Sequence, residues 1–336
     1  MPHTAVVILN WNGLRFLQEF LPSAIANSGS CEVIVADNAS TDGSVAFLQE
    51  HFPEVRRILL PSNYGFCEGY NQALRQVEAT YYVLLNSDVA VPPNWTEPVL
   101  QLMESDASVA VCQPKILSQQ QPAFFEYAGA GGGMMDALGY PFCRGRLFET
   151  LEEDHGQYND LQEIFWATGA CMFVRSSVYH ALGGLEPGFF AHMEEIDFCW
   201  RARNAGYKVL YNGHSQVYHV GGGTLHKSNP RKTYLNFRNG LALLYKNLPS
   251  QELLPTLSLR VLLDWLAAVR FLIGGQVADA RMVLKAQADV LLKWNYWRSR
   301  RKEQPRKGDF KHMPGVYKGS IVWAYFVKKK KTAQEL

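Results

Sequence analysis

The 336-residue chain contains only six cysteines, and no two of them form a CxxC pair. This scatter provides neither the ligand spacing of a zinc site nor the framework of a disulfide-rich domain, so we expect reduced thiols. The first twenty residues also lack a basic segment followed by a long apolar stretch. No secretory signal peptide is therefore expected, and the sequence predicts a cytoplasmic protein.

Two nucleotide-binding motifs are missing as well. No GxGxxG follows the first apolar run, and no GxxxxGKS/T occurs anywhere in the chain. Dehydrogenases and P-loop enzymes would therefore lack their phosphate cradle here. A nucleotide bound by this chain needs its phosphates neutralised in another way, and a divalent metal held by a carboxylate is the obvious candidate. Asp88, just after the most apolar run at residues 81–85, is well placed to hold that metal.

The chain has no long uninterrupted apolar segment. Residues 257–277 come nearest, but Arg260, Asp264 and Arg270 interrupt them. At about 100° per residue these three charges fall within one third of a helix circumference. That spacing predicts a helix lying on a surface rather than one crossing a bilayer.

The chain as a whole has no large excess of one charge, since it contains 33 Lys and Arg and 31 Asp and Glu. Its N-terminal and C-terminal parts nevertheless differ in net charge. Residues 1–226 have a net charge of −13, and residues 227–336 have a net charge of +15. This predicts an acidic N-terminal domain at 1–226 and a basic, amphipathic helical region at 227–336, where Arg281, Lys285, Asp289 and Lys293 recur every fourth residue. The split excludes a uniformly basic nucleic-acid binder, and no nucleic-acid partner is expected.

Short apolar runs alternate with helical stretches through the first third of the chain. Strands are expected at residues 5–9, 33–36, 58–60 and 81–85, and helices at 14–26, 44–51 and 69–77. This rhythm predicts an α/β fold with a mostly parallel sheet covered by helices on both faces. Polar residues follow every strand. The carboxyl ends of parallel strands share one edge, so these residues predict a binding site there, although each one alone is also typical of turns and caps.

Six glycines between Gly129 and Gly145 make the next segment too glycine-dense for regular structure, so we expect a long surface loop near the site or a set of turns. Further on, Glu194, Glu195 and Asp197 crowd together beside aromatic residues. Adjacent carboxylates raise at least one pKa and can supply a general base, but acidic residues also favour the first turn of a helix.

Five motifs in a fixed order resemble those of the family 2 glycosyltransferases of GT-A fold. They are VVILNWN at 6–12, VIVADNASTDGS at 33–44, NYGF at 63–66, LLNSD at 84–88 and EEIDFCWR at 194–201. The resemblance covers about residues 4–245. It implies an inverting, metal-dependent transfer of a hexosyl or deoxyhexosyl unit from a nucleotide-diphosphate sugar to an acceptor hydroxyl. The acceptor it suggests is a glycan or lipid-linked glycan in cell-surface polysaccharide synthesis.

The resemblance also assigns the residues that contact the sugar donor. Asn10 and Asp37 are implied to bind its nucleobase and ribose, and Gly169 and Ala170 to pack against its sugar. The remaining substrate- and nucleotide-binding residues are expected to be Asn12, Asn38, Asn63, Gly65, Asn71, Asn86, Ser87 and Arg238.

For the metal and the base, the resemblance implies the following roles. Asp88 matches the last residue of the family's DXD motif and would hold manganese or magnesium on the donor phosphates. Asn86 stands where many members have Asp, so weaker metal affinity is expected. His219 matches a metal-ligating histidine of some members, although a lone His is more often structural. Glu195 matches the base position, commonly Asp, with Glu194 and Asp197 as competing assignments.

Two rival functions and one open question about the C-terminus remain. A nucleotidyltransferase needs a glycine-rich, basic loop after the first strand, where residues 10–16 offer only Arg15. A catalytically silent scaffold of the same fold is the other rival.

Residues 320–327 are apolar and four lysines follow. They predict either an anchor that holds the protein at the anionic inner face of the cell membrane or a final element packed on the core.

Overall fold

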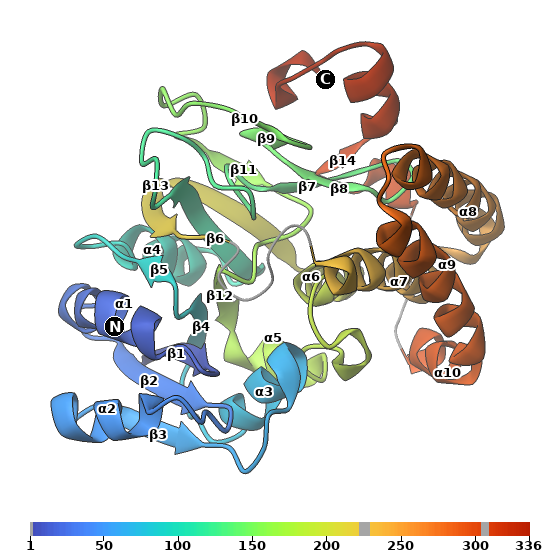
Figure 1. Cartoon of the computed structure of the whole chain (residues 1–336). Coiled ribbons are helices and arrows are strands. Elements are labelled where there is room, and N and C mark those ends of the chain that lie inside the picture. The colour runs from blue at the N-terminus through green and yellow to red at the C-terminus, as the bar shows by residue number, and fades with distance from the viewer. Residues whose placement is uncertain (1–2, 222–228, 304–308) are drawn as a thin grey trace.

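The computed structural model describes residues 3–221, 229–303 and 309–336. Within them a nine-stranded sheet and a five-stranded sheet lie next to each other, and a group of long helices flanks both (Figure 1). In the nine-stranded sheet the order is β11-β13-β6-β12-β4-β1-β2-β3, with β5 paired to β13.

The N-terminal part of the nine-stranded sheet is parallel, as predicted. It comprises β1 (Thr4–Asn10), β2 (Glu32–Asp37), β3 (Arg56–Leu59) and β4 (Tyr81–Asn86), connected through helices α1 (Leu14–Asn27), α2 (Ser44–His51) and α3 (Gly65–Leu74). Alternate residues of β1 enter two separate cores. Ala5 and Val7 pack in the core that includes α3, and Val6 and Ile8 pack in the core that includes α1 and α2. The near-continuous apolar strands therefore reflect burial on both faces.

The rest of this sheet is mixed. Strand β12 (Cys171–Arg175) runs antiparallel to both β4 and β6 (Val109–Ser118), while β13 (Lys208–His219) pairs parallel to β6. The short strands β5 (Val89–Ala90) and β11 (Leu161–Glu163) are antiparallel to β13. Helices α4 (Glu97–Ser105), α5 (Ser176–Ala181) and α6 (Glu194–Asn204) cover its faces, with the 3-10 turn η1 (Pro187–Phe189) before α6.

The glycine-rich segment consists of short strands joined by turns, so the prediction of one long surface loop is wrong, whereas five of its six glycines lie outside the strands, as the alternative of turns predicts. It contributes β7 (Gly133–Asp136), β8 (Pro141–Cys143) and β9 (Arg146–Leu147) to the five-stranded sheet, which β10 (Thr150–Leu151) and β14 (Val316–Tyr317) complete. The glycines allow close packing against large rings. A Cβ atom on Gly133 would lie 2.2 Å from the indole of Trp166, and one on Gly145 would lie 2.6 Å from the ring of Phe125.

The C-terminal region is helical, as predicted, with α7 (Pro230–Asn247), α8 (Ser250–Ile273), α9 (Val277–Leu292) and α10 (Trp294–Glu303). Trp297 of α10 and Phe310 of the short turn η2 (Phe310–His312) belong to the same core as α3 and α6. The proposed domain boundary at 226/227 lies outside the described residues and stays a prediction. In the part of the chain that the structure describes, no helix has the length and apolarity needed to cross a bilayer.

The last segment packs on the protein, which was one of the two predicted alternatives. Ile321, together with Tyr325 of the π-helical turn η3 (Trp323–Val327), packs against Phe142 and Leu147 of the five-stranded sheet. A final 3-10 turn, η4 (Ala333–Glu335), follows.

Candidate active site

The carboxyl ends of β1 and β2 bring three polar side chains together. The Asn10 amide donates to Asp37 Oδ2 at 3.0 Å and to Ser40 Oγ at 3.1 Å, and Asp37 Oδ1 accepts the Ser40 N–H at 2.8 Å. Asn10 and Asp37 are both buried, yet Asn10 Oδ1 has no hydrogen-bond partner. The predicted rim therefore exists. Ser40, which sequence reasoning did not select as a site residue, is part of its network.

The neighbouring strand ends extend this rim. Asn38 donates to Asn63 Oδ1 at 3.1 Å and to the Gly65 carbonyl at 3.0 Å, and its own Oδ1 accepts the Tyr64 N–H. Asn12, on the other side, accepts the Thr41 N–H at 2.7 Å. These amide side chains hold the loops after β2 and β3 in place around the strand ends.

The residues after β4 lie beside the same rim. A Cβ atom on Gly13 would lie 2.4 Å from Asn10 Oδ1 and 3.5 Å from Ser87 Oγ, which places Ser87 next to Asn10. The Asn86 N–H donates to the Ala170 carbonyl at 3.0 Å. At the residue before Ala170, a Cβ atom on Gly169 would lie 4.0 Å from Glu195 Cβ. Strand β4 is thus connected, through residues 169 and 170, to the start of α6.

A histidine between two carboxylates lies beyond Ser87. His219 Nε2 is 3.2 Å from Asp88 Oδ1, and His219 Nδ1 is 3.2 Å from Glu126 Oε2, all three side chains being buried. Burial alone would lower the pKa of His219, but the carboxylates of Asp88 and Glu126 raise it to about 10. Sequence reasoning missed Glu126, which carries no motif and is recognisable only through its contact with His219.

The chemistry of Asp88 and His219 suits a divalent metal. A carboxylate oxygen and an imidazole nitrogen are ligands that manganese accepts, and the second ring nitrogen of His219 faces Glu126 in the manner of an outer-shell carboxylate. Among the residues that the structure describes, no group of three acidic, histidine or cysteine side chains forms a metal cage. Two such ligands would leave coordination positions for phosphate oxygens and water. The glycines at 222 and 223, after His219, lie outside the described residues.

The three candidate bases at the start of α6 have different environments. Asp197 is fully buried, and it bonds Arg201 Nε at 2.7 Å, Lys246 Nζ at 2.8 Å and Asn247 Nδ2 at 2.8 Å. Glu194 is buried and Glu195 partly exposed, and Oε2 of each has no hydrogen-bond partner. Burial raises the pKa of both glutamates, that of Glu195 to about 7, and repulsion from Glu195 adds to the rise for Glu194.

The loop that leads into α6 is strained. Phe190, His192 and Met193 all have φ between 67° and 73°, a left-handed conformation that is rare for residues with a side chain. The Asn239 amide of α7 is within bonding distance of the carbonyls of Phe189, Ala191 and His192 at 2.7–3.1 Å. Its contacts fix the backbone that positions Glu195.

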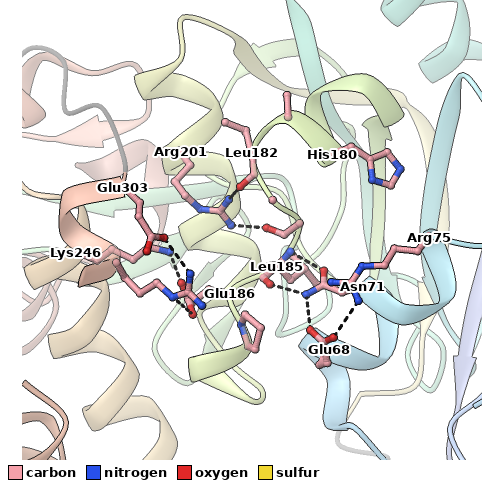
Figure 2. A pocket seen from close by; sticks show the side chains of 15 residues that line it. Glu68, Asn71, Arg75, His180, Leu182, Leu185, Glu186, Arg201, Lys246 and Glu303 are labelled. Carbon is pink, nitrogen blue, oxygen red and sulfur yellow. Dashed lines mark hydrogen bonds and ion pairs between the residues drawn. The ribbon is translucent and has the colours of Figure 1, made fainter. Parts of the chain in front are cut away.

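Two predicted binding residues make their contacts within the protein. Arg238, which is buried, donates to the Phe189 carbonyl at 2.8 Å, next to Asn239. Asn71 donates to the Leu185 carbonyl at 2.8 Å and accepts the Leu185 N–H at 2.9 Å. Figure 2 shows Asn71 at a polar cavity of about 360 Å³, where Lys246 pairs with Glu186 at 2.9 Å. These contacts stabilise the fold, and the donor-binding roles of Arg238 and Asn71 stay predictions.

Comparison with known proteins identifies this arrangement. The family model described as glycosyl transferase family 2 matches residues 5–183, which is more than half of the chain. The chain belongs to glycosyl transferase family 2. Its match ends before α6, so the family model covers the strand-end rim and Asp88 but not Glu195 or His219. The predicted enzyme class is confirmed, which disfavours the nucleotidyltransferase alternative.

This glycosyltransferase has relatives among bacterial and archaeal enzymes. It is 24% identical over 235 residues to the N-acetylglucosaminyl-diphospho-decaprenol L-rhamnosyltransferase of Mycobacterium tuberculosis, covering 64% of this chain and 75% of the relative. It is 25% identical over 247 residues to the low-salt glycan biosynthesis hexosyltransferase Agl10 of Haloferax volcanii, covering 70% of this chain and 73% of that relative.

A solved structure shares the fold of the glycosyltransferase. The mannosyltransferase PcManGT from Pyrobaculum calidifontis, in complex with GDP-Man and Mn²⁺, superposes with a TM-score of 0.54 at 14% identity and covers 90% of this chain and 85% of that one. The likeness confirms the α/β fold of GT-A type with a helical C-terminal region.

Proposed function

We propose that this glycosyltransferase moves a hexosyl or deoxyhexosyl unit, with inversion, from a nucleotide-diphosphate sugar to a hydroxyl of a glycan or lipid-linked acceptor in cell-surface glycan synthesis. The names of the relatives support it, since one acts on a decaprenol-linked substrate and another is a hexosyltransferase. The proposed location is cytoplasmic, with peripheral contact at the inner face of the membrane, where a lipid-linked acceptor would lie.

The observation that carries the proposal is the position of Glu195, whose buried Oε2 has no hydrogen-bond partner. It stands beside Gly169, and Gly169–Ala170 connects it to Asn86 and the rim where Asn10 and Asp37 meet. Oε2 of Glu195 and Oε2 of Glu194 are both buried and without a partner, and Glu195 is the less buried of the two residues and the one beside Gly169. A general base needs a free lone pair within reach of the acceptor, and a carboxylate oxygen without a protein partner keeps that lone pair.

The mechanism follows from where charge develops. Glu195 takes the proton from the acceptor hydroxyl as that oxygen attacks the anomeric carbon from the face opposite the departing diphosphate. Asn10 and Asp37 orient the nucleoside, and the 169–170 backbone lies against the sugar. Asp88 and His219 would hold a manganese or magnesium ion, which when bound supplies positive charge to the departing diphosphate.

A panel of nucleotide-diphosphate sugars, incubated with the purified chain and Mn²⁺ or Mg²⁺, tests the proposal through released nucleotide diphosphate. Release from one donor supports a sugar transferase. Release of pyrophosphate with nucleoside triphosphates would make the chain a nucleotidyltransferase, and no turnover across the panel would favour the silent scaffold.

The role of Glu126 can be measured without turnover. Because outer-shell carboxylates orient a ligating histidine, Glu126→Gln is expected to weaken Mn²⁺ binding about 10- to 100-fold, as measured from the electron paramagnetic resonance signal of free Mn²⁺. Glu153→Gln, at an exposed glutamate of the same region, is the matched control. Equal Mn²⁺ affinity in Glu126→Gln and the unmodified protein would remove Glu126 from the metal site.

A further inference from the structure

Helix α8 is oriented with its two central charges, Arg260 and Asp264, inward and many of its apolar side chains outward. Asp264 is fully buried and Arg260 nearly so. Arg260 donates to the Gly139 carbonyl at 2.8 Å, and its guanidinium lies 3.7 Å from the ring centre of Tyr140. Two of the three charges in the predicted cluster, Arg260 and Asp264, thus lie on the face that packs on the protein, while Arg270 near the end of the helix is exposed. This is the reverse of an ordinary surface helix, whose polar face meets water.

The outward face of α8 is a stripe of large apolar side chains. Its exposed members are Leu254, Leu259, Leu262, Trp265, Leu266, Val269, Leu272 and Ile273. Leu266 is 65% and Ile273 84% exposed. A continuous stripe of this size is far more than the scattered single apolar residues found on most protein surfaces, and it marks an interaction site.

Neighbouring elements extend the stripe and add positive charge. Helix α9 packs beside α8, where Trp265 Nε1 donates to Gln287 at 2.8 Å, and both helices lie at the edge of the molecule far from β2 and β3 (Figure 1). The Arg270 guanidinium lies 4.9 Å from the ring centre of Phe326, which joins the end of α8 to η3. Exposed apolar side chains on these neighbours are Val277, Leu284, Leu291, Leu292, Trp294, Trp323 and Val327.

The exposed charges around these elements are mostly positive. In the described part of residues 250–336, the exposed basic residues are Arg270, Arg281, Lys285, Lys293, Arg298, Lys302, Lys311, Lys318, Lys328, Lys329 and Lys331. The exposed acidic ones there are Glu303, Asp309 and Glu335. Such a surface complements an anionic one. A second copy of this chain docked on the same face would bring like charges together, so a homodimer is disfavoured.

We infer that the exposed face of α8 and α9, together with Trp323, Val327 and the adjacent lysines, docks on an anionic phospholipid surface. The apolar stripe enters the boundary between headgroups and acyl chains, the tryptophans lie at that boundary, and the cations contact lipid phosphates. This inference rests on the proposed function, which places the enzyme at the inner face of the membrane. The test of docking needs neither sugar donor nor acceptor. The docking inference and the proposed transferase function can therefore fail independently.

Flotation of the full chain with vesicles tests the inference. The protein is expected to float with vesicles of phosphatidylcholine and phosphatidylglycerol at low salt, and to float less with phosphatidylcholine alone. The double variant Leu266→Gln/Ile273→Gln should bind about tenfold more weakly, because two exposed side chains lose their apolar transfer into lipid. Arg281→Gln and Lys285→Gln should each cost about fivefold on anionic vesicles.

A matched double variant, Leu59→Gln/Leu161→Gln, changes apolar side chains that are 56% and 53% exposed but lie on β3 and β11. It should float like the unmodified protein, and so should Glu195→Gln, which separates docking from transfer. Circular dichroism checks that each variant is folded. Two results would overturn the inference: failure of the unmodified protein to float with anionic vesicles, or equal flotation of Leu266→Gln/Ile273→Gln. A dimer that this variant dissociates, without vesicle binding, would identify a protein interface instead.

Discussion

Asp197 and Glu195 lie on the same turn of α6 and are both carboxylates, but their surroundings are opposite. Asp197 accepts from Arg201, Lys246 and Asn247, and Glu195 keeps an oxygen without a partner. Burial would raise the pKa of Asp197, but Lys246 and Arg201 hold it below its usual range, whereas the pKa of Glu195 is raised.

The contrast supports a division of this acidic cluster between stability and the proposed proton transfer. The partners of Asp197 come from α6 itself and from α7, so this carboxylate ties the two helices together. Nothing comparable neutralises Glu195. A carboxylate that is fully paired has no lone pair for a substrate, so we assign structure to Asp197 and proton transfer to Glu195.

The largest expected effect is that of Glu195→Gln on transfer. Loss of a general base typically costs about 10²- to 10⁴-fold in rate, and the isosteric amide should leave the fold and sugar-donor binding intact. Product formation and nucleotide binding are measured on the same preparation. Should Glu194→Gln cause the larger loss, the base would be Glu194.

Asp197→Ala should act on stability instead. Removing one partner of a buried ion pair leaves a buried charge without its counter-ion, here Arg201, because Lys246 keeps Glu186; this costs about 3–5 kcal/mol in the free energy of unfolding. Urea denaturation measures it. Because the pKa of Asp197 is lowered, its stabilisation is complete at pH 7 and is lost only as the pH falls through that lowered value. A loss of stability below about 1 kcal/mol would contradict the pairing argument.

The pH dependence of transfer should report Glu195. A base acts when it is deprotonated, so kcat/KM should rise through about pH 7 and fall about tenfold per unit below it. Initial rates between pH 5 and 9 measure the profile, and Glu195→Gln should flatten it. A profile that is already flat at pH 5 would instead indicate a base with an ordinary carboxylate pKa.

The smallest effect is a gain in stability from Glu194→Gln. Burial and repulsion from Glu195 raise the pKa of the Glu194 carboxyl. The folded state is therefore destabilised at pH values at which Glu194 ionises. Above neutral pH the amide should therefore stabilise the protein by about 1 kcal/mol, and the gain should vanish in acid, where the carboxyl is protonated in both states. Thermal unfolding at pH 5 and pH 8 compares the two conditions, and a gain at pH 5 alone would reverse the argument.

Local patterns predicted the parallel half of the sheet well. The predicted helix at 44–51 coincides with α2, and the polar residues after β1, β2 and β4 do share one edge. Both follow from rules that act over a few residues, namely strand periodicity and the common direction of parallel strands.

The errors and omissions come from contacts between distant segments. The glycine-rich stretch packs as short strands and turns because Gly133, in β7, and Gly145, in the turn before β9, admit Trp166 and Phe125, a condition that local composition does not reveal. Glu126 meets His219 only in the folded chain. Likewise, the spacing of Arg260 and Asp264 predicts that they share a face but not that this face is the buried one.

The buried charges of α8 also bear on how the protein is made. Before the chain folds, this 24-residue segment is a largely apolar stretch that an insertion channel can sample. A charged residue near the middle of such a stretch opposes its entry into the bilayer by roughly 2.5–3.5 kcal/mol. Arg260 and Asp264 occupy the middle of α8, so they keep the nascent helix out of the lipid core. Folding then buries both charges, and in the proposed docking α8 lies along the bilayer surface.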